Sequence, residues 1–468
     1  MLYLALGKGR REPNHAKVLA RICRLQYGMQ TVYLLLSGAS CLYFIRREFD
    51  LFTICFYSST IYFAPALFGY TCYDWRSSEL YPVSTRAYVF YIFYITALVV
   101  SALVFGRGSW RNAQADLSRN PNAIRSKSQA TLLRGYRGAF LTTCALLVMT
   151  LASGSGPLFV SSKQDLLDNA PSTLPFFQGG IVLFGSTALI LGRRRGIALA
   201  FALCAFDLAM GFRGATAFVL LVGITWLGYK WRGTPRGRSY RLALPFLFIL
   251  LYLGSATISG IAAAIRQSAL GMGFGDLGTA EWLGPQIQYT EAFSQQAIFD
   301  RVINADIVLP WSYFTDLFRV FVPKVHEVFG SPNDFNAVFQ PLLFPEIPWG
   351  MASNIWAEQF CIGGEIWLTA FTLFVFATIG IANRYILSSL SKGHYAGAAL
   401  LTILAVPAIF YMHRNGLVYQ SKLVRDSALI ALICFILGSL HHELHSAIYG
   451  KFHSRFRGRG ASDTAARK

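Results

Sequence analysis

Long uninterrupted apolar runs constrain this chain more than any other feature of its sequence. Several of them approach or exceed about 18 residues, the length at which a helix crosses a hydrocarbon core of roughly 30 Å. Only 14% of the residues are charged and 54% are hydrophobic, whereas soluble domains carry about 25% charged residues. This composition excludes disordered, collagen-like and disulfide-scaffold classes. The sequence therefore predicts an all-α polytopic membrane protein.

The apolar runs predict about 11 transmembrane helices, within a range of 10 to 12. The predicted spans are 28–45, 51–70, 88–105, 138–152, 176–192, 196–211, 214–230, 242–263, 355–382, 396–412 and 427–440. They divide the chain into a basic tail (1–27), eight spans (28–263), a large loop (264–354), three spans (355–440) and a second basic tail (441–468). No cleavable signal peptide is expected, because the first apolar run follows a basic segment and leads directly into further spans.

Charge along the chain predicts the orientation of these spans. Lys and Arg cluster at 107–137, 193–195, 230–241 and 451–468. Such clusters are typical of cytoplasmic loops facing anionic lipids, so the net charge of +19 requires no nucleic-acid partner. The 264–354 loop instead holds 4 basic and 9 acidic residues, which predicts a periplasmic location. One feature disagrees with this topology, because the alternation of spans leaves the basic 1–27 tail outside.

The large loop is also unusually aromatic. It combines Trp, Tyr and many Phe with seven prolines, a composition that does not suit a disordered linker. We expect it to fold, with amphipathic helices lying over the spans and contributing to function.

Three arginines fall at the predicted outer ends of spans, where the positive-inside rule does not account for them. They are Arg213 in GFRGA, Arg266 in AIRQS and Arg414 in MHRNG. Charged residues at such depth are costly and are functional candidates by default. Their planar cations match phosphate oxygens in bidentate geometry, so convergence would create an anion site. The structural alternative is that each arginine extends its charge from a turn to the membrane surface.

Further polar residues accompany these cations. Gln267 follows Arg266 and could bind a phosphate or a sugar hydroxyl, whereas Lys163 in VSSKQD is more simply read as a solvated loop lysine. Glu358 in NIWAEQF either pairs with one of the arginines or acts as a general base.

The HHELH segment resembles a metal motif only superficially. His441 and His445 are four residues apart, but a zinc protease requires the order HExxH. We therefore predict an interfacial role for these histidines, with no metal site and no cofactor.

Five short segments together carry a family resemblance. They are GPLFVSSKQDLLD (156–168), GFRGATAFVLL (211–221), AIRQ (264–267), ASNIWAEQFCIGGEIW (352–367) and MHRN (412–415). In this order they resemble bacterial O-antigen polymerases of the Wzy type. The resemblance covers the chain from about residue 150 onward; the first 150 residues match only in hydropathy.

The resemblance implies a glycosyltransferase-C-like fold and metal-independent transfer of glycan between undecaprenyl-diphosphate carriers. The site would face the periplasm from the inner membrane, and a chain-length regulator would be a partner. The outward arginines would stabilise the leaving diphosphate, and His413 or Glu358 would remove the acceptor proton. The resemblance also implies substrate contacts by Lys163 and Gln267, and by Arg319, which has Gly330 at a matching spacing.

Three other functions remain open from the sequence. An O-antigen ligase would share the leaving group and differ in its acceptor. A lipid-linked oligosaccharide flippase or other transporter would show repeated halves, which the sequence does not display. A non-catalytic scaffold would leave the outward arginines unexplained.

Overall fold

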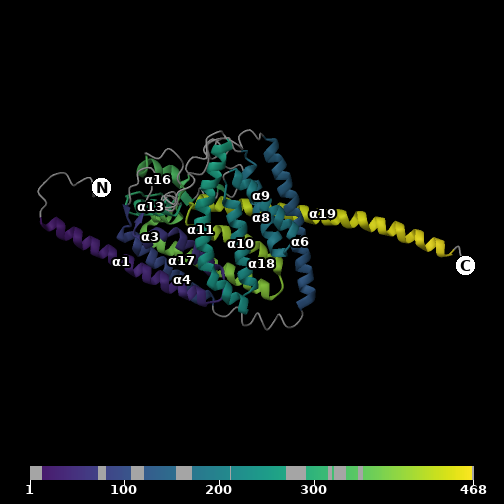
Figure 1. The fold of residues 1–468 in the computed structure, drawn as a ribbon, viewed down its shortest axis with the longest axis horizontal. Helices are drawn as coiled ribbons and strands as arrows, with labels where there is room; N and C mark the ends of the chain where they lie inside the picture. The colour runs from purple at the N-terminus through teal and green to yellow at the C-terminus, as the bar shows by residue number, and fades with distance from the viewer. Residues whose placement is uncertain are drawn as a thin grey trace.

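The computed structural model describes most of the chain as helices (Figure 1). It describes residues 13–71, 81–106, 121–153, 171–210, 212–269, 291–314, 319–320, 334–345 and 352–465. The elements are α1 (Pro13–Arg46), α2 (Leu51–Tyr62), α3 (Ala64–Phe68), β1 (Tyr70–Thr71), β2 (Tyr81–Pro82), α4 (Thr85–Gly106), α6 (Pro121–Ala152), α8 (Leu174–Leu191), α9 (Arg194–Ala209), α10 (Gly214–Lys230), α11 (Pro235–Ala269), α13 (Glu291–Ile303), α16 (Phe335–Leu343), α17 (Ile355–Ser391), α18 (Tyr395–Tyr411) and α19 (Leu417–Ala465). Strands β1 and β2 form a short antiparallel ladder. The start of α1 and the end of α19 project from the bundle on opposite sides.

The predicted helical membrane character is confirmed. Within the described residues, 6 helices are long and apolar enough to cross a membrane: α1, α4, α6, α8, α17 and α19. Helices α2, α10 and α18 are shorter and also apolar. Large apolar side chains such as Leu35 (70% exposed), Phe246 (70%) and Phe374 (67%) lie on the outer surface, as expected where lipid replaces water. The 11-span count stays a prediction.

Several helices extend beyond the predicted spans. The last span was predicted over 427–440, but α19 begins at Leu417 and continues through the predicted basic tail to Ala465. Likewise α6 begins at Pro121, before the predicted start of its span. In each case the added turns are rich in charged residues, which apolar windows exclude although Lys and Arg are good helix formers.

Hydrogen bonds between connections hold one end of the bundle together. The Glu48 carboxylate after α1 accepts from Arg241 Nη1 at 2.9 Å and from the Gly233 amide at 3.1 Å. Arg232 Nη1 donates to the Phe49 carbonyl at 3.0 Å. The α1–α2 connection is thereby fixed to the connection between α10 and α11.

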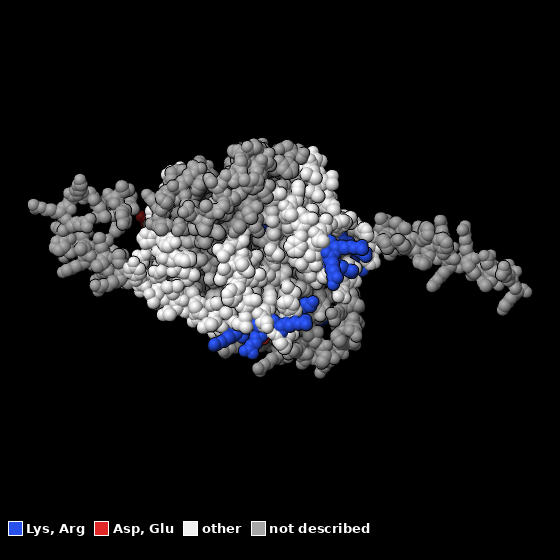
Figure 2. Space-filling model, in the orientation of Figure 1, with Lys and Arg blue, Asp and Glu red and all other residues white. Residues whose placement is uncertain are grey.

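We call this the basic end of the bundle. It comprises residues 46–51, 128–134, 190–195, 226–241 and 384–396. In Figure 2 one group of Lys and Arg side chains lies along the lower edge and another at mid-height on the right, both away from α13 and α16. Positive charge at one end is what the positive-inside rule predicts for the cytoplasmic side.

Helix α13, from the predicted large loop, packs at the opposite end, which we call the polar end. Asp300 of α13 accepts hydrogen bonds from the Ser84 amide at 3.1 Å and from the Ser84 hydroxyl. Burial raises the pKa of Asp300 to about 6. Arg86 Nη1 donates to the Ile303 carbonyl at 2.6 Å. These bonds join the loop helix to the start of α4.

Helices α6 and α19 cross at glycines. A Cβ added to Gly138 would lie 1.7 Å from the Cys434 carbonyl oxygen, and one added to Gly438 would lie 2.0 Å from that of Arg134. Small residues at such crossings allow helix backbones to approach closely. These glycines thereby set the position of α19.

Helix α17 is interrupted at Gly363 and Gly364. Gly364 has φ +66° and ψ −158°, a conformation essentially restricted to glycine. The break separates a short leading segment, 355–362, from the long apolar remainder. The Cys361 carbonyl accepts a hydrogen bond from the Leu309 amide at 2.8 Å. A carbonyl at the break therefore has a hydrogen-bond donor from the segment that follows α13, residues 304–314.

Candidate functional site

Glu358 lies at the meeting point of two helix N-termini. It occupies the first turn of α17, and its Oε2 accepts a hydrogen bond from the Leu417 amide, the first residue of α19, at 2.6 Å. Ser353 Oγ accepts from the Gly416 amide at 2.5 Å. A Cβ at residue 416 would lie 3.0 Å from Glu358 Oε2, so glycine permits this approach. A carboxylate here is favoured by both helix dipoles and caps α19 from a neighbouring element.

The second carboxylate oxygen of Glu358 is differently placed. The side chain is fully buried, and within the described residues Oε1 has no partner at hydrogen-bonding distance. The Tyr313 hydroxyl and the Asp334 carboxylate interact electrostatically with the Glu358 carboxylate. Within the described residues Glu358 forms no ion pair with an arginine. One oxygen therefore holds α19, and the second oxygen takes no part in that cap.

Arg414 contacts Tyr411 directly, and the backbone that follows Arg213 lies beside the same side chain. Arg414 Nη1 donates to the Tyr411 hydroxyl at 3.1 Å, and the guanidinium carbon lies 5.1 Å from the ring centroid. Arg213 directly precedes α10, whose first residue, Gly214, approaches the same hydroxyl: a Cβ there would lie 3.2 Å from it. Phe218 packs edge-on against the ring with centroids 4.6 Å apart. Packing of α10 on α18 thus brings both arginine backbones beside one hydroxyl.

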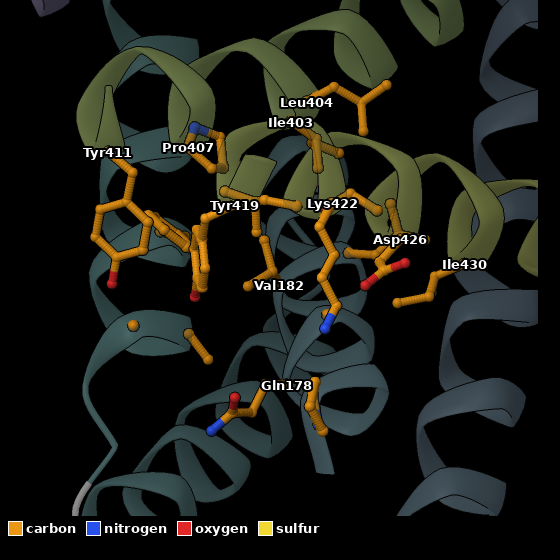
Figure 3. A pocket seen from close by; sticks show the side chains of 18 residues that line it. Gln178, Val182, Ile403, Leu404, Pro407, Tyr411, Tyr419, Lys422, Asp426 and Ile430 are labelled. Carbon is orange, nitrogen blue, oxygen red and sulfur yellow. The ribbon is translucent and has the colours of Figure 1, made fainter. Parts of the chain in front are cut away.

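A cavity of about 230 Å³ opens beside this tyrosine, between α8, α10, α18 and α19. Most of its lining is apolar. Figure 3 shows Lys422 reaching into the space, with its amine toward Gln178, while Tyr411 and Tyr419 lie along one side. Lys422 and Asp426 are the charged residues among the lining, and the apolar wall is suited to a hydrocarbon chain.

His413 is enclosed by aromatic rings. Its Nδ1 accepts a hydrogen bond from the Trp356 indole at 3.1 Å, and its Nε2 lies 3.5 Å from the Tyr94 hydroxyl. Tyr62 stacks on the imidazole with centroids 5.7 Å apart, and Phe63 packs edge-on at 5.2 Å. Burial lowers the pKa of His413 to about 3. The histidine is therefore a neutral packing residue with both nitrogens facing protein groups.

Buried amides near the connection before α19 retain hydrogen-bonding capacity. Gln420 is 7% exposed, and neither its Nε2 nor its Oε1 has a partner within the described residues. The Asn415 Nδ2 and Gln295 Oε1 atoms are also buried without a hydrogen-bond partner within the described residues. Amides of this kind are suited to the paired donors and acceptors of sugar hydroxyls.

The remaining predicted residues are less completely placed. Arg266 and Gln267 lie in the last turns of α11, but their side chains lie outside the described set, and Lys163 lies outside the described residues. Arg319 is partly buried. Its neighbour Val320 accepts a hydrogen bond from Arg425 of α19 through its carbonyl. This places the Arg319 backbone near α19.

Sequence reasoning missed Lys422, Gln420 and Arg425. All three lie between the predicted last two spans, in a stretch that was interpreted as a connector. A helical reading of residues 417–426 would have placed Lys422 and Asp426 one turn apart, on one face.

The helices and their exposed apolar surface define the class: an all-α membrane protein with a buried polar site at one end. No known family model, curated protein or solved structure matched the chain.

Proposed function

We propose that this protein polymerises oligosaccharide repeat units carried on undecaprenyl diphosphate, for O-antigen, capsule or exopolysaccharide. The placement of Arg213 and Arg414 around Tyr411, beside a mostly apolar cavity, carries the proposal. A lipid diphosphate has the two properties that this arrangement matches, a strongly anionic group and a long apolar chain. The family resemblance of the sequence supports the same reaction.

The reaction assigns each group a role. The acceptor hydroxyl oxygen attacks the anomeric carbon of the growing glycan, and the bond from that carbon to the diphosphate oxygen breaks. The diphosphate leaves with the electron pair, and the arginines stabilise the charge that develops. The acceptor proton passes to Glu358 Oε1. His413 is the weaker candidate base, because both of its nitrogens face protein groups.

The unpartnered amides and the outer helices complete the proposed site. Gln295, Asn415 and Gln420 would bind sugar hydroxyls, and α13 with the Tyr313 segment would cover the reacting centre from water. The site would face the periplasm of the bacterial inner membrane, where a chain-length regulator would act on the same polymer. Arg266, Gln267, Lys163 and Arg319 remain proposed substrate contacts.

The banding pattern of surface polysaccharide in a deletion strain of the host tests the proposal. Complementation with the wild-type chain should restore the ladder of long polymers. Arg213→Ala, Arg414→Ala and Arg266→Ala should each leave a single attached repeat while the protein is still inserted. The matched control is Arg238→Ala, which removes an exposed cation at the basic end and should give the full ladder.

The alternatives give different patterns. Complete loss of attached glycan in the deletion strain indicates a ligase or a flippase. A full ladder in all three arginine variants would falsify the site.

A further inference from the structure

A second cavity, of about 420 Å³, lies at the basic end of the bundle, far along the same helices from the polar site. It is bounded by the start of α6, the ends of α8, α10 and α17, and the start of α18. The proposed polymerase mechanism does not use it.

The lining has the composition of a membrane interface. Its apolar part consists of Leu132, Leu189, Ile190, Leu191, Leu227 and Leu390. Trp226 and Tyr395 add two amphipathic rings, of the kind enriched where hydrocarbon meets headgroups. The cavity also lies at the ends of apolar helices, which is the depth of lipid headgroups. An apolar wall and an aromatic rim at this depth suit acyl chains and a glycerol backbone.

Among the described residues that line the cavity, the only charged side chain is a cation. Lys230 is exposed and lines it, and no carboxylate is among the lining residues. Exposed Arg193 and Lys392 directly follow two lining segments, the end of α8 and the end of α17. Two acidic residues in the described α1–α2 connection at the basic end are already paired: Glu48 with Arg241, and Asp50 with Arg47. The cavity therefore favours an anion.

We propose that this cavity binds an anionic phospholipid, with its phosphate at Lys230 and its acyl chains along the leucines. Basic pockets between membrane helices on the cytoplasmic side have this chemistry. A free phosphate would satisfy Lys230 but would leave the apolar wall exposed to water. A zwitterionic phospholipid would fill the wall, but its choline would bring a second cation next to Lys230. The inference does not depend on the proposed polymerase activity.

Native mass spectrometry of the full-length protein tests the proposal. The protein is released from detergent after incubation with phosphatidylglycerol, and retained lipid is counted. Lys230→Gln should lower retention about fivefold, as expected for one cation near a headgroup. Leu227→Trp, which fills the cavity without changing charge, should lower it at least as much. Arg238→Gln is the matched control at the same end and should retain lipid as the wild type does.

Four outcomes would overturn the assignment. Equal loss in Arg238→Gln would mean diffuse attraction to the basic end. Retention of phosphatidylcholine equal to that of phosphatidylglycerol would show that the headgroup charge does not determine binding. Displacement by glycerol 3-phosphate at the same concentration would mean a soluble anion as ligand. Unchanged retention in both cavity variants, with each protein folded by its thermal transition, would place the lipid elsewhere.

Discussion

The indole nitrogen of Trp356 donates a hydrogen bond to Nδ1 of His413 over 3.1 Å. Because indole can only donate, Nδ1 must be the unprotonated nitrogen, and the proton of the neutral ring lies on Nε2, facing the Tyr94 hydroxyl. The bond connects the leading segment of α17, which carries Glu358, to the α18–α19 connection, which carries Arg414. The imidazole that joins them stays neutral near neutral pH.

The first prediction concerns the pH dependence of stability. The folded protein keeps His413 neutral down to a pKa of about 3, whereas the unfolded chain binds a proton near 6.5. Stability from this group is therefore complete above pH 6.5 and is lost as the pH falls toward 3, by about 1.4 kcal/mol per pH unit. Thermal unfolding of wild type and His413→Gln across this range should show a shallower acid dependence in the variant. Parallel curves would contradict the assignment.

The second prediction separates the two oxygens of Glu358. Glu358→Gln keeps an oxygen for the Leu417 amide but cannot accept the acceptor's proton. We expect its thermal transition to stay near that of the wild type, while polymer formation falls by about 100-fold or more. Glu358→Ala should also lower the unfolding free energy by about 1–3 kcal/mol, because a buried amide loses its partner. Normal polymerisation by the glutamine variant would leave Glu358 a capping residue alone.

The third prediction concerns the hydroxyl of Tyr411. Tyr411→Phe keeps the ring that packs on Phe218 but removes the acceptor of Arg414. The guanidinium should lose its fixed orientation, so polymers should shorten while the thermal transition changes little. Tyr419→Phe is the matched control, since it removes a hydroxyl from the same cavity. If both variants behave alike, Tyr411 does not orient the arginine.

The fourth prediction concerns the crossing of α6 and α19. Gly138→Ala places a methyl group against the Cys434 backbone, which cannot move without separating the helices, and should lower the unfolding free energy by about 1–3 kcal/mol. Gly38→Ala in α1 has nothing within 4 Å of its Cβ, and the better helix propensity of alanine should leave stability unchanged or slightly higher. A stable Gly138→Ala protein would argue against the close crossing.

Apolar run length located most of the apolar helices, because burial in lipid imposes that pattern directly on sequence. The single span predicted over 51–70 is wrong, since the structure divides it between α2 and α3. It did not locate the start of α19, since Lys422, Arg425 and Asp426 break an apolar window without breaking a helix. The break at Gly363 and Gly364 was likewise invisible, because two glycines in an apolar helix are common.

The sequence predicted individual residues of the candidate site but not the contacts between them. Arg213, Arg414 and Glu358 could each be selected from charge and position. The bond from Arg414 to Tyr411, the position of Gly214 beside the same hydroxyl, and the capping of α19 by Glu358 depend on how α10, α17 and α18 pack. No local pattern encodes such contacts between distant segments.

The bond from the Leu309 amide to the Cys361 carbonyl has a consequence for tolerance to substitution. Because both partners are main-chain atoms, a change of side chain at position 309 leaves this hydrogen bond in place, and only proline there removes the donor. The link from residue 309 to the interrupted helix is therefore independent of that side chain, whose identity is constrained separately by its burial in the core.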